Sequence, residues 1–247
     1  NSWQLVALCL ACARIGAAAG PVLPIMRRRE VEYMLRLTKS PVYVAEAEFR
    51  GFSYAEMSRE VVAAVPCQRV LIGGDGDDAL DFDRDLLGDE PDENDLRALD
   101  SLEAAPDDIA QVMFPSGTTG EPKGVMHSHN TLYAMNQAQL RVLDLSEHEV
   151  TAMGSPTTHQ AGYTWNFVMP LMLGATAVQV DSWDPELMLD ILEERRVTFF
   201  MGAPTFLSDL IEAQRSGPRD LSALRTFATG SAPIAPVLVR RAHEVLE

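Results

Sequence analysis

Cysteine is scarce in this chain, which has three in 247 residues. A small, odd number of cysteines in a chain of this length does not build a disulfide framework, so we expect a cytoplasmic protein. Cys9 and Cys12 form a CxxC pair, which in other settings is redox-active. Here the pair lies in a stretch rich in alanine and leucine, not at a strand-to-helix junction. We therefore expect two buried helix residues.

Basic residues are also few: 20 Lys and Arg stand against 36 Asp and Glu, a formal net charge of −16. Such a charge opposes binding to nucleic acid or to an anionic membrane, and it repels a free nucleotide unless positive potential is focused locally. Long apolar runs are lacking too. Residues 3–20 come nearest to one, but Arg14 interrupts them and they fall short of the ~20 apolar residues of a membrane span. We expect a packed helix there and no transmembrane segment.

The ends of the sequence lack the marks of a whole chain. It begins without methionine and stops at Glu247 inside a helical pattern, so we expect a fragment cut at both ends. Its 47% apolar content is nevertheless enough for a sizeable core, in one large α/β domain or in two lobes.

Acidic residues concentrate in residues 75–100, where twelve of them face only Arg84 and Arg97. Glycines and a proline are interspersed, so we expect a solvated surface connection. A calcium loop around residues 75–78 is the alternative, but the bidentate glutamate that ends such loops is missing at the proper spacing. We place a first lobe at residues 1–74, the acidic connection at residues 75–106 and a second lobe at residues 107–247.

Apolar spacing and turn residues predict strands that alternate with helices. In the first lobe we expect helices at residues 3–16, 30–37 and 54–65, and strands at 17–24, 42–45 and 69–72. In the second lobe we expect strands at 109–114, 125–127, 150–153, 175–180, 198–201 and 225–229, and helices at 128–140, 163–173, 185–195, 205–213 and from 236 onward. The first two strands of the second lobe pair as a hairpin, and Ser128 caps the helix that follows. This order predicts an α/β fold with two lobes of mainly parallel sheet flanked by helices.

Residues 116–124 are Ser-Gly-Thr-Thr-Gly-Glu-Pro-Lys-Gly, a loop dense in hydroxyls and glycines. Glycine lets the backbone approach an anion closely, and successive N–H groups in such a turn form an anion-binding concavity. The hydroxyls add donors, and Lys123 adds a mobile point charge suited to phosphate oxygens. The pattern predicts a phosphate-binding loop formed by Ser116, Gly117, Thr118, Thr119, Gly120, Lys123 and Gly124.

Three other interpretations of this region compete with that one. The P-loop of nucleoside triphosphatases has a GxxxxGK pattern, but here Pro122 stands where it needs glycine and Gly124 where it needs a metal-binding hydroxyl. An ordinary Gly/Thr hairpin turn does not need so many donors. His127 and His129 form an HxH pair that invites a metal-hydrolase interpretation, but no set of Asp, Glu or His with zinc-like spacing stands nearby.

Three further loops follow predicted strands, at residues 155–162, 202–204 and 230–233. In open parallel sheets, ligands bind beyond the carboxyl ends of the strands. We therefore expect these three loops and the phosphate loop to converge on one crevice.

The string from Phe114 to His129, with SGTTGEPKG at its centre, resembles the signature loop of the AMP-forming, adenylate-forming enzymes. That superfamily includes acyl- and aryl-CoA synthetases, luciferases and the adenylation domains of peptide synthetases. The resemblance extends over almost the whole chain, because the order of helices and strands fits the amino-terminal domain of the superfamily. Residues 183–204 are most similar to ligases that activate cyclohexanecarboxylate and medium-length fatty acids.

The resemblance implies a set of site residues. The phosphate loop binds ATP, with Lys123 and Thr118 as catalytic groups and Thr118 on Mg²⁺ through ATP. His159 lies near the bound carboxylate, where it orients the substrate or gates the thiol path, although a loop histidine taken alone is more often structural. The nucleotide also meets the loop of Gly230, Ser231, Ala232 and Pro233. The acyl pocket is lined by His159, Gln160, Trp165, Asn166, Met201, Gly202, Ala203 and Thr205, each of which can equally be ordinary core.

The activity that the resemblance implies is condensation of a small carboxylic acid with ATP to an acyl-adenylate, followed by transfer to CoA. This activity requires ATP, Mg²⁺ and CoA. The resemblance leaves open whether the full-length protein forms a homo-oligomer. Transfer of the acyl group to a carrier protein and a catalytically incomplete nucleotide-binding fragment remain alternatives. The sequence departs from the family because it stops before the glutamate that helps hold magnesium, the ribose-binding aspartate and the small mobile domain with its lysine. We therefore expect the isolated fragment to be inactive.

Overall fold

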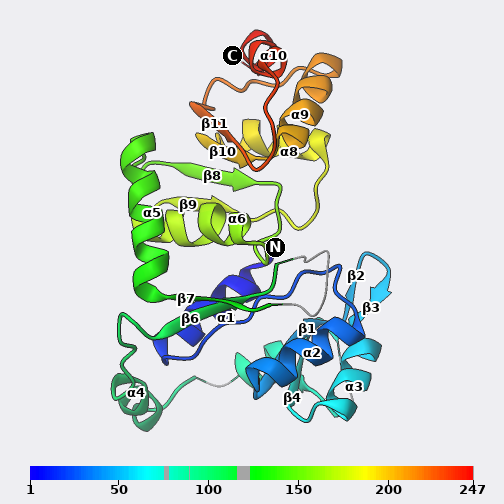
Figure 1. Cartoon of the computed structure of the whole chain (residues 1–247), viewed down its shortest axis with the longest axis vertical. Helices are drawn as coiled ribbons and strands as arrows, with labels where there is room; N and C mark the ends of the chain where they lie inside the picture. Colours follow the sequence, from blue (N-terminus) through cyan, green and yellow to red (C-terminus); the bar gives the residue numbers. More distant parts are fainter. Residues whose placement is uncertain (75–77, 89, 116–122, 247) are drawn as a thin grey trace.

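The computed structural model describes residues 1–74, 78–88, 90–115 and 123–246. Figure 1 shows an elongated molecule whose lower half is built from the first part of the chain and whose upper half is built from the last part. Strands and helices alternate through most of its length, which confirms the expected α/β class. Among the helices described, none is both long and apolar enough to cross a membrane.

A three-stranded parallel sheet lies in the lower half, in the order β1 (Val42–Glu46), β4 (Gln68–Ile72) and β5 (Leu80–Asp81). Helices α2 (Arg28–Thr38) and α3 (Tyr54–Ala64) pack with it. Their common core removes apolar surface from water and so holds the helices to the sheet. Its buried members are Val31, Leu35, Tyr43, Met57, Val61 and Val65.

A short hairpin of β2 (Glu48–Phe49) and β3 (Phe52–Ser53) precedes α3. Its two turn residues, Arg50 and Gly51, both have positive φ, as a tight two-residue hairpin turn requires. The Arg50 guanidinium donates a hydrogen bond to the Ser182 hydroxyl, which belongs to the upper half of the molecule. This contact joins the two halves.

Residues 78–100 hold more regular structure than the expected surface connection. β5 extends the first sheet, the π-helical turn η1 (Phe82–Leu86) follows it, and α4 (Glu93–Asp100) comes later. Asp92 starts α4, because its side chain accepts the N–H groups of Asn94 and Asp95. Acidic residues in a first turn also favour the positive end of the helix dipole. The segment is nevertheless solvated as expected, since most of its described side chains are exposed.

The prediction of a strand at residues 17–24 is wrong. Only Ala19 pairs there, as an isolated bridge to Gln111 of β6 (Ile109–Met113), with N···O distances of 2.9 Å for both of its backbone bonds. Pro21 and Pro24 explain the outcome, because proline has no N–H to donate to a ladder.

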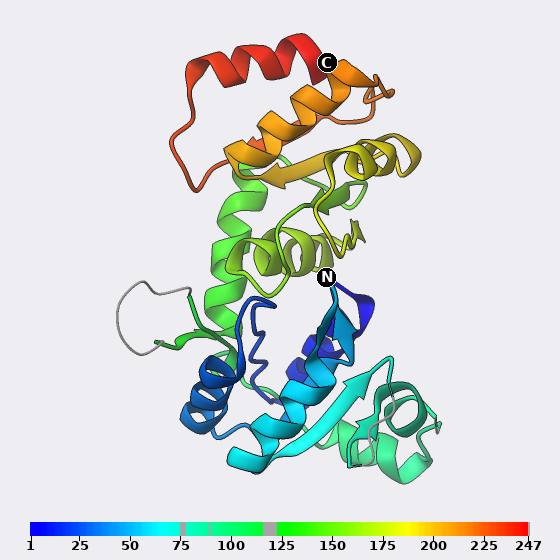
Figure 2. The same ribbon diagram turned by 90° about the vertical axis from the view of Figure 1, so that its right-hand side faces the viewer.

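The upper half is built on a four-stranded parallel sheet in the order β11-β10-β8-β9. Its strands are β8 (Val150–Met153), β9 (Thr176–Val178), β10 (Phe199–Gly202) and β11 (Thr226–Thr229). Helices α8 (Pro185–Glu194), α9 (Pro204–Ser216) and α10 (Pro236–Leu246) cover one face, and Figure 2 shows α9 and α10 side by side at the far end. On the other face lie α5 (His129–Leu143), η2 (Thr164–Val168) and α7 (Met169–Leu173).

Successive side chains of β10 point alternately to these two faces, as the two-residue period of a strand requires. Phe200 packs with α8 and α9, whereas Phe199 and Met201 pack with α5, η2 and α7. The parallel sheet is therefore buried on both sides, which is typical of α/β domains.

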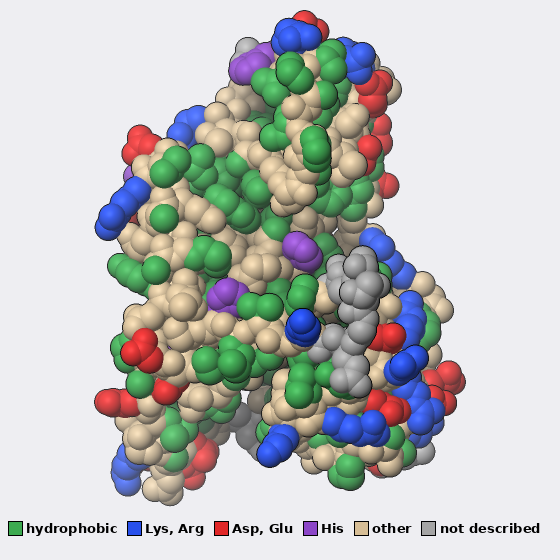
Figure 3. Space-filling model, viewed as in Figure 1, with side chains coloured by type: hydrophobic (Ala, Val, Ile, Leu, Met, Phe, Trp, Pro, Cys, Tyr) green, Lys and Arg blue, Asp and Glu red, His purple; other side chains and the backbone are tan. Residues whose placement is uncertain are grey.

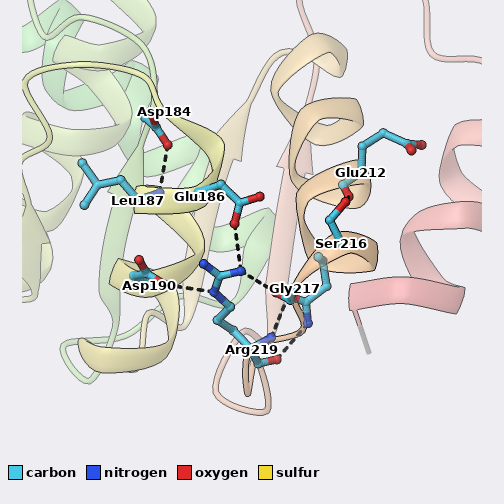
Figure 4. A network of polar contacts seen from close by, with 9 residues as sticks. Asp184, Glu186, Leu187, Asp190, Glu212, Ser216, Gly217 and Arg219 are labelled. Atoms are coloured by element: carbon cyan, nitrogen blue, oxygen red, sulfur yellow. Dashed lines mark hydrogen bonds and ion pairs between the residues drawn. The ribbon is translucent and has the colours of Figure 1, made fainter.

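Arg219 fixes the turn after α9 to α8, as Figure 4 shows. Its Nε donates to Asp190 at 2.9 Å, and its Nη1 lies 2.8 Å from the Glu186 carboxylate. The Gln214 amide bonds the backbone of Arg219 in both directions, at 2.8 and 3.0 Å. These contacts have a structural role, since they hold the helices of one face in register.

The predicted hairpin of the second half is confirmed, with β6 antiparallel to β7 (Val125–Ser128). Ser128 caps α5 as expected, because its Oγ accepts the N–H of Thr131 at 3.2 Å. Helix α1 (Trp3–Arg14) packs on this region through Cys9, which lies in one cluster with Ala110 and Leu132. Burial, together with the neighbouring Cys12, raises the pKa of the Cys9 thiol to about 12. Of the two residues expected to be buried, Cys9 is buried and Cys12 is partly buried.

Candidate functional site

The carboxyl ends of β8, β10 and β11 lie at one edge of the upper sheet, because the three strands are neighbours and parallel. The chain leaves these strands at Gly154, Ala203 and Gly230, which lie in or directly before the three segments that the sequence singled out, at residues 155–162, 202–204 and 230–233. The fourth segment is the predicted phosphate loop. Its residues Ser116, Gly117, Thr118, Thr119 and Gly120 lie outside the described part of the chain.

A cavity of about 140 Å³ lies between the ends of the β6–β7 hairpin and residues 155–160, the stretch after β8 that we call the β8 segment. Its walls are mostly apolar, with polar atoms contributed by the β8 segment and by His127 of β7. Figure 3 shows that the middle of this side of the molecule is mainly hydrophobic or uncharged, with acidic side chains toward its margins. The cavity is lined by Leu23, Met113, Phe114, Pro115, Val125, His127, Thr158, His159 and Gln160.

Lys123 and Gly124 stand directly before β7, at the mouth of the hairpin. Lys123 is exposed. Gly124 is packed closely, since a Cβ there would lie 3.1 Å from Val112 and 3.3 Å from the Phe114 ring. Val125, the first residue of β7, lines the cavity, so the backbone places Lys123 two residues from a cavity wall.

His159 starts the short helix α6 (Gln160–Tyr163), because its Nδ1 accepts the N–H of Ala161 at 3.2 Å. A neutral imidazole that accepts at Nδ1 carries its proton on Nε2. The exposed ring therefore offers an Nε2–H donor beside the cavity.

Three buried polar atoms at this edge of the sheet have no hydrogen-bond partner among the described residues: Thr158 Oγ1, Gln160 Oε1 and Thr229 Oγ1. Two of these side chains line the cavity, and Thr229 ends β11. Buried polar groups in proteins are nearly always paired, so a group left free at a cavity is available to a bound molecule. Thr158 carried no signal in the sequence beyond its place next to His159.

Trp165 and Met201 come from two elements and meet in one cluster, in which Trp165 stacks on Phe199 with ring centres 5.8 Å apart. Met201 also adjoins the β11 loop, since its terminal methyl is 3.9 Å from where a Cβ on Gly230 would be. Asn166 is fully buried, and its amide donates to the Val178 carbonyl at 3.0 Å and accepts from the Thr151 hydroxyl at 3.2 Å. These bonds give Asn166 a structural role, and its place in an acyl pocket stays a prediction.

Gly202 ends β10 where there is no room for a side chain: a Cβ would lie 2.9 Å from the Phe200 ring. Ala203 is the N-cap of α9, and Thr205 is exposed in its first turn. The loop that follows β11 is unusual, because Ser231 adopts φ 69°, the left-handed region that non-glycine residues seldom occupy. Such strain persists mainly where a loop has a specific task. Ala232 and Pro233 next to it are exposed.

Two glycines that the sequence did not single out for a role of their own shape the β8 segment. A Cβ on Gly162 would lie 2.1 Å from the Pro156 carbonyl oxygen, so the segment rests directly on α6. A Cβ on Gly154 would lie 2.4 Å from the Trp183 ring. Glycine in both places lets the backbone and the ring approach closely.

The HxH pair gains no third ligand from the described residues, where no group of three His, Cys, Asp or Glu side chains could hold a metal ion. The two histidines also belong to different elements, since His127 lies in β7 and His129 is the first residue of α5. Thr118, the residue predicted to face Mg²⁺, is outside the described residues.

A doubly covered parallel sheet with its loops, a cavity and unpaired polar atoms at the carboxyl edge defines a ligand-binding α/β domain. The chain belongs to the AMP-binding enzyme family, whose pattern matches residues 1–247. This confirms the resemblance seen in the sequence.

Relatives within the family show the same relation over the whole chain. The chain is 30% identical over 241 residues to a medium-chain fatty-acid–CoA ligase of Escherichia coli, covering 98% of this chain and 42% of that protein. It is 31% identical over 248 residues to Triostin synthetase I of Streptomyces triostinicus, covering 100% and 44%. Its fold matches the anthranilate CoA ligase AuaEII, solved with anthranoyl-AMP, with a TM-score of 0.87 at 24% identity over 99% of this chain and 46% of that one. The chain thus spans a little under half the length of these proteins.

Proposed function

We propose that this chain forms the phosphate-binding and acyl-binding part of an AMP-forming acyl-CoA synthetase. The observation that carries the proposal is the cavity where the β6–β7 hairpin meets His159 and two side-chain oxygens, Thr158 Oγ1 and Gln160 Oε1, that have no partner among the described residues. Membership of the AMP-binding enzyme family supports it.

The first step joins a carboxylic acid to ATP. A carboxylate oxygen attacks the α-phosphorus, the bond from that phosphorus to the bridging oxygen of the β-phosphate breaks, and pyrophosphate leaves with the electron pair. Negative charge spreads over the phosphate oxygens in the transition state, so fixed positive charge and N–H donors accelerate the step. Lys123 supplies the charge, and residues 116–120 supply the hydroxyls and backbone amides of the predicted loop.

In the second step the sulfur of CoA attacks the acyl carbon, and the bond from that carbon to the AMP phosphate oxygen breaks. AMP leaves with the electron pair, and the thiol proton passes to solvent. The Nε2–H of His159 and the hydroxyl of Thr158 lie at the cavity, where they orient the acyl carbonyl by donating hydrogen bonds. Mg²⁺ would neutralise phosphate charge when bound, with Thr118 as its nearest residue through ATP.

The acid that this site accepts is apolar. Met201 and Ala203 lie at the carboxyl end of β10, and Trp165 packs in one apolar cluster with Met201. Such side chains suit an alkyl or alicyclic chain. The relative from Escherichia coli, by its name, activates medium-chain fatty acids. A pocket distinguishes neighbouring acids by only about 1 to 3 kcal/mol per methylene, so a series of acids is accepted with graded efficiency.

A carrier protein is the alternative acceptor, and the similarity to Triostin synthetase I favours keeping it. Both versions share the adenylation step and differ only in the thiol that receives the acyl group. Adding CoA or a phosphopantetheinylated carrier to the acyl-adenylate separates them, because only the true acceptor releases AMP.

Acid-dependent exchange of pyrophosphate into ATP tests the proposal directly. It is measured on the protein as its gene encodes it, with straight-chain acids of increasing length and with cyclohexanecarboxylate. We expect exchange with at least one of these acids and none without acid. A protein that binds ATP yet exchanges no pyrophosphate with any acid would contradict the proposal.

A further inference from the structure

Asn1 links two segments that are far from it in the sequence. Its Nδ2 donates to the Val180 carbonyl at 2.7 Å and to the Ser155 carbonyl at 3.2 Å, and its Oδ1 accepts the N–H of Thr157 at 2.5 Å. Ser155 and Thr157 follow β8, and Val180 follows β9. Figure 1 places the amino end at the junction of the two halves of the molecule, beside this edge of the upper sheet.

The hydrogen bonds continue from Thr157 into the core. Thr157 is buried, and its hydroxyl donates to Gln179 Oε1 at 3.2 Å. Gln179 Nε2 donates in turn to the backbone carbonyl of Asn166 at 2.8 Å. The β8 segment is thereby tied to β9 and to the backbone of η2 through two carboxamide side chains, those of Asn1 and Gln179.

This anchoring matters because the segment carries the polar wall of the cavity. Thr158, His159 and Gln160 follow Thr157 directly. Two backbone groups of the segment, the Ser155 carbonyl and the Thr157 N–H, bond the Asn1 side chain, so the placement of the residues that follow depends on Asn1.

We propose that Asn1 is a positioning residue that holds the segment at residues 155–160 in the form that lines the cavity. A carboxamide suits the task because it offers two N–H donors and an acceptor from one short side chain. Aspartate has no donor for the two carbonyls, and an apolar residue leaves all three backbone groups unpaired. The effect on acid binding rests on the proposed function, whereas the effect on the segment itself does not.

Hydrogen exchange of backbone amides tests the structural part on the natural protein. In Asn1→Ala we expect amides of residues 155–161 to exchange about 5- to 30-fold faster, because the segment loses hydrogen bonds that each favour the closed form modestly. Amides of β10 should keep their rates. Asn94→Ala is the matched control, since Asn94 is exposed on α4.

A second variant keeps the proposal testable if Asn1→Ala does not fold. Thr157→Val keeps the shape of the side chain and removes only its bond to Gln179. We expect a smaller acceleration confined to the same residues. Unchanged exchange of residues 155–161 in both variants would overturn the proposal, as would acceleration throughout the molecule with no excess in this segment.

The kinetic measurement links the segment to catalysis. In Asn1→Ala we expect the KM for the acid to rise several-fold while the KM for ATP stays within about twofold, a split that a general loss of stability does not produce. A wild-type protein without acid-dependent exchange would contradict the proposed function and leave the hydrogen-exchange result to decide the role of Asn1. Equal rises in both KM values would overturn the positioning role in catalysis.

Discussion

Lys123 stands two residues before Val125 of the cavity wall in a strongly acidic chain, and we propose that it supplies positive charge to the bound phosphates. In Lys123→Ala we expect acid-dependent pyrophosphate exchange to slow by about 10- to 1000-fold, because charge that stabilises the transition state is lost. The exchange rate at saturating ATP and acid measures this. Arg141→Ala is the control, since it removes an exposed cation from α5. An unchanged rate in Lys123→Ala would remove the lysine from the mechanism.

The Thr158 hydroxyl has no hydrogen-bond partner among the described residues, and we propose that it binds the acid. In Thr158→Val we expect the KM for the acid to rise by about 5- to 20-fold, the effect of one lost hydrogen bond, with little change in the free energy of unfolding. Steady-state kinetics and urea unfolding measure the two quantities.

Thr198→Val gives the contrasting case. The Thr198 hydroxyl donates to the buried Glu149 carboxylate at 2.5 Å and accepts the N–H of Val150 at 2.9 Å. Its removal should cost about 1 to 3 kcal/mol of unfolding free energy, because the partners are left unpaired. A loss of stability in Thr158→Val equal to that in Thr198→Val would mean that the Thr158 hydroxyl also has a structural partner.

At the scale of elements, the close packing of the β8 segment against α6 depends on the absence of a side chain at Gly162. Gly162→Ala adds a Cβ at 2.1 Å from the Pro156 carbonyl oxygen, which is backbone and cannot rotate away. We expect a loss of about 1 to 3 kcal/mol of unfolding free energy from overpacking, which exceeds the ~1 kcal/mol that alanine gains over glycine in a helix.

Urea unfolding of Gly162→Ala measures that loss. Gly20→Ala is a suitable comparison, because the nearest atom to its added Cβ is 3.9 Å away, an ordinary contact. Similar stabilities for the two variants would show that the β8 segment moves aside at little cost.

At the scale of the whole molecule, three buried acids predict how stability depends on alkaline pH. Burial raises the pKa of Cys9 to about 12 from 9.0, and it also raises the pKa values of Tyr43 and Tyr163 above their ordinary value of 10.0. The unfolded chain loses these protons first, so it binds fewer protons than the folded chain. The contribution of these three groups to the free energy of unfolding should therefore be present in full below about pH 9 and decline as the pH rises above it.

Urea midpoints between pH 8 and pH 11 measure this dependence. Tyr43→Phe should flatten the decline, because it removes one of the three groups. Tyr133→Phe should leave it unchanged, since Tyr133 is exposed. Stability that does not fall by pH 11 would contradict the expected shifts.

Local sequence was sufficient for most elements. The cap at Ser128 and the apolar spacing of α3 each act over a few residues, and the structure forms helices where these patterns indicate. The predictions made from the sequence failed at two places. Pro21 and Pro24 limited the expected strand to one bridge at Ala19, and α4 formed in a run whose charges suggested only solvation.

The candidate site divides in the same way. Lys123, His159 and the Gly230–Pro233 loop stand out because their residue types and their positions after strands carry information in the sequence. Thr158 and Asn1 do not, because an unpaired hydroxyl or a carboxamide bridge is a property of what surrounds a side chain. Asn166 was expected in a pocket, yet its partners are Val178 and Thr151.

The sequence by itself determined the α/β class and the family, since both depend on residue type, spacing and order along the chain. Only the tertiary structure decided which strand ends share an edge, which polar atoms remain unpaired beside the cavity, and that Asn1 holds the segment after β8. Those properties depend on contacts between residues as far as 179 positions apart. Such contacts exist only once burial of the apolar faces has brought the elements together.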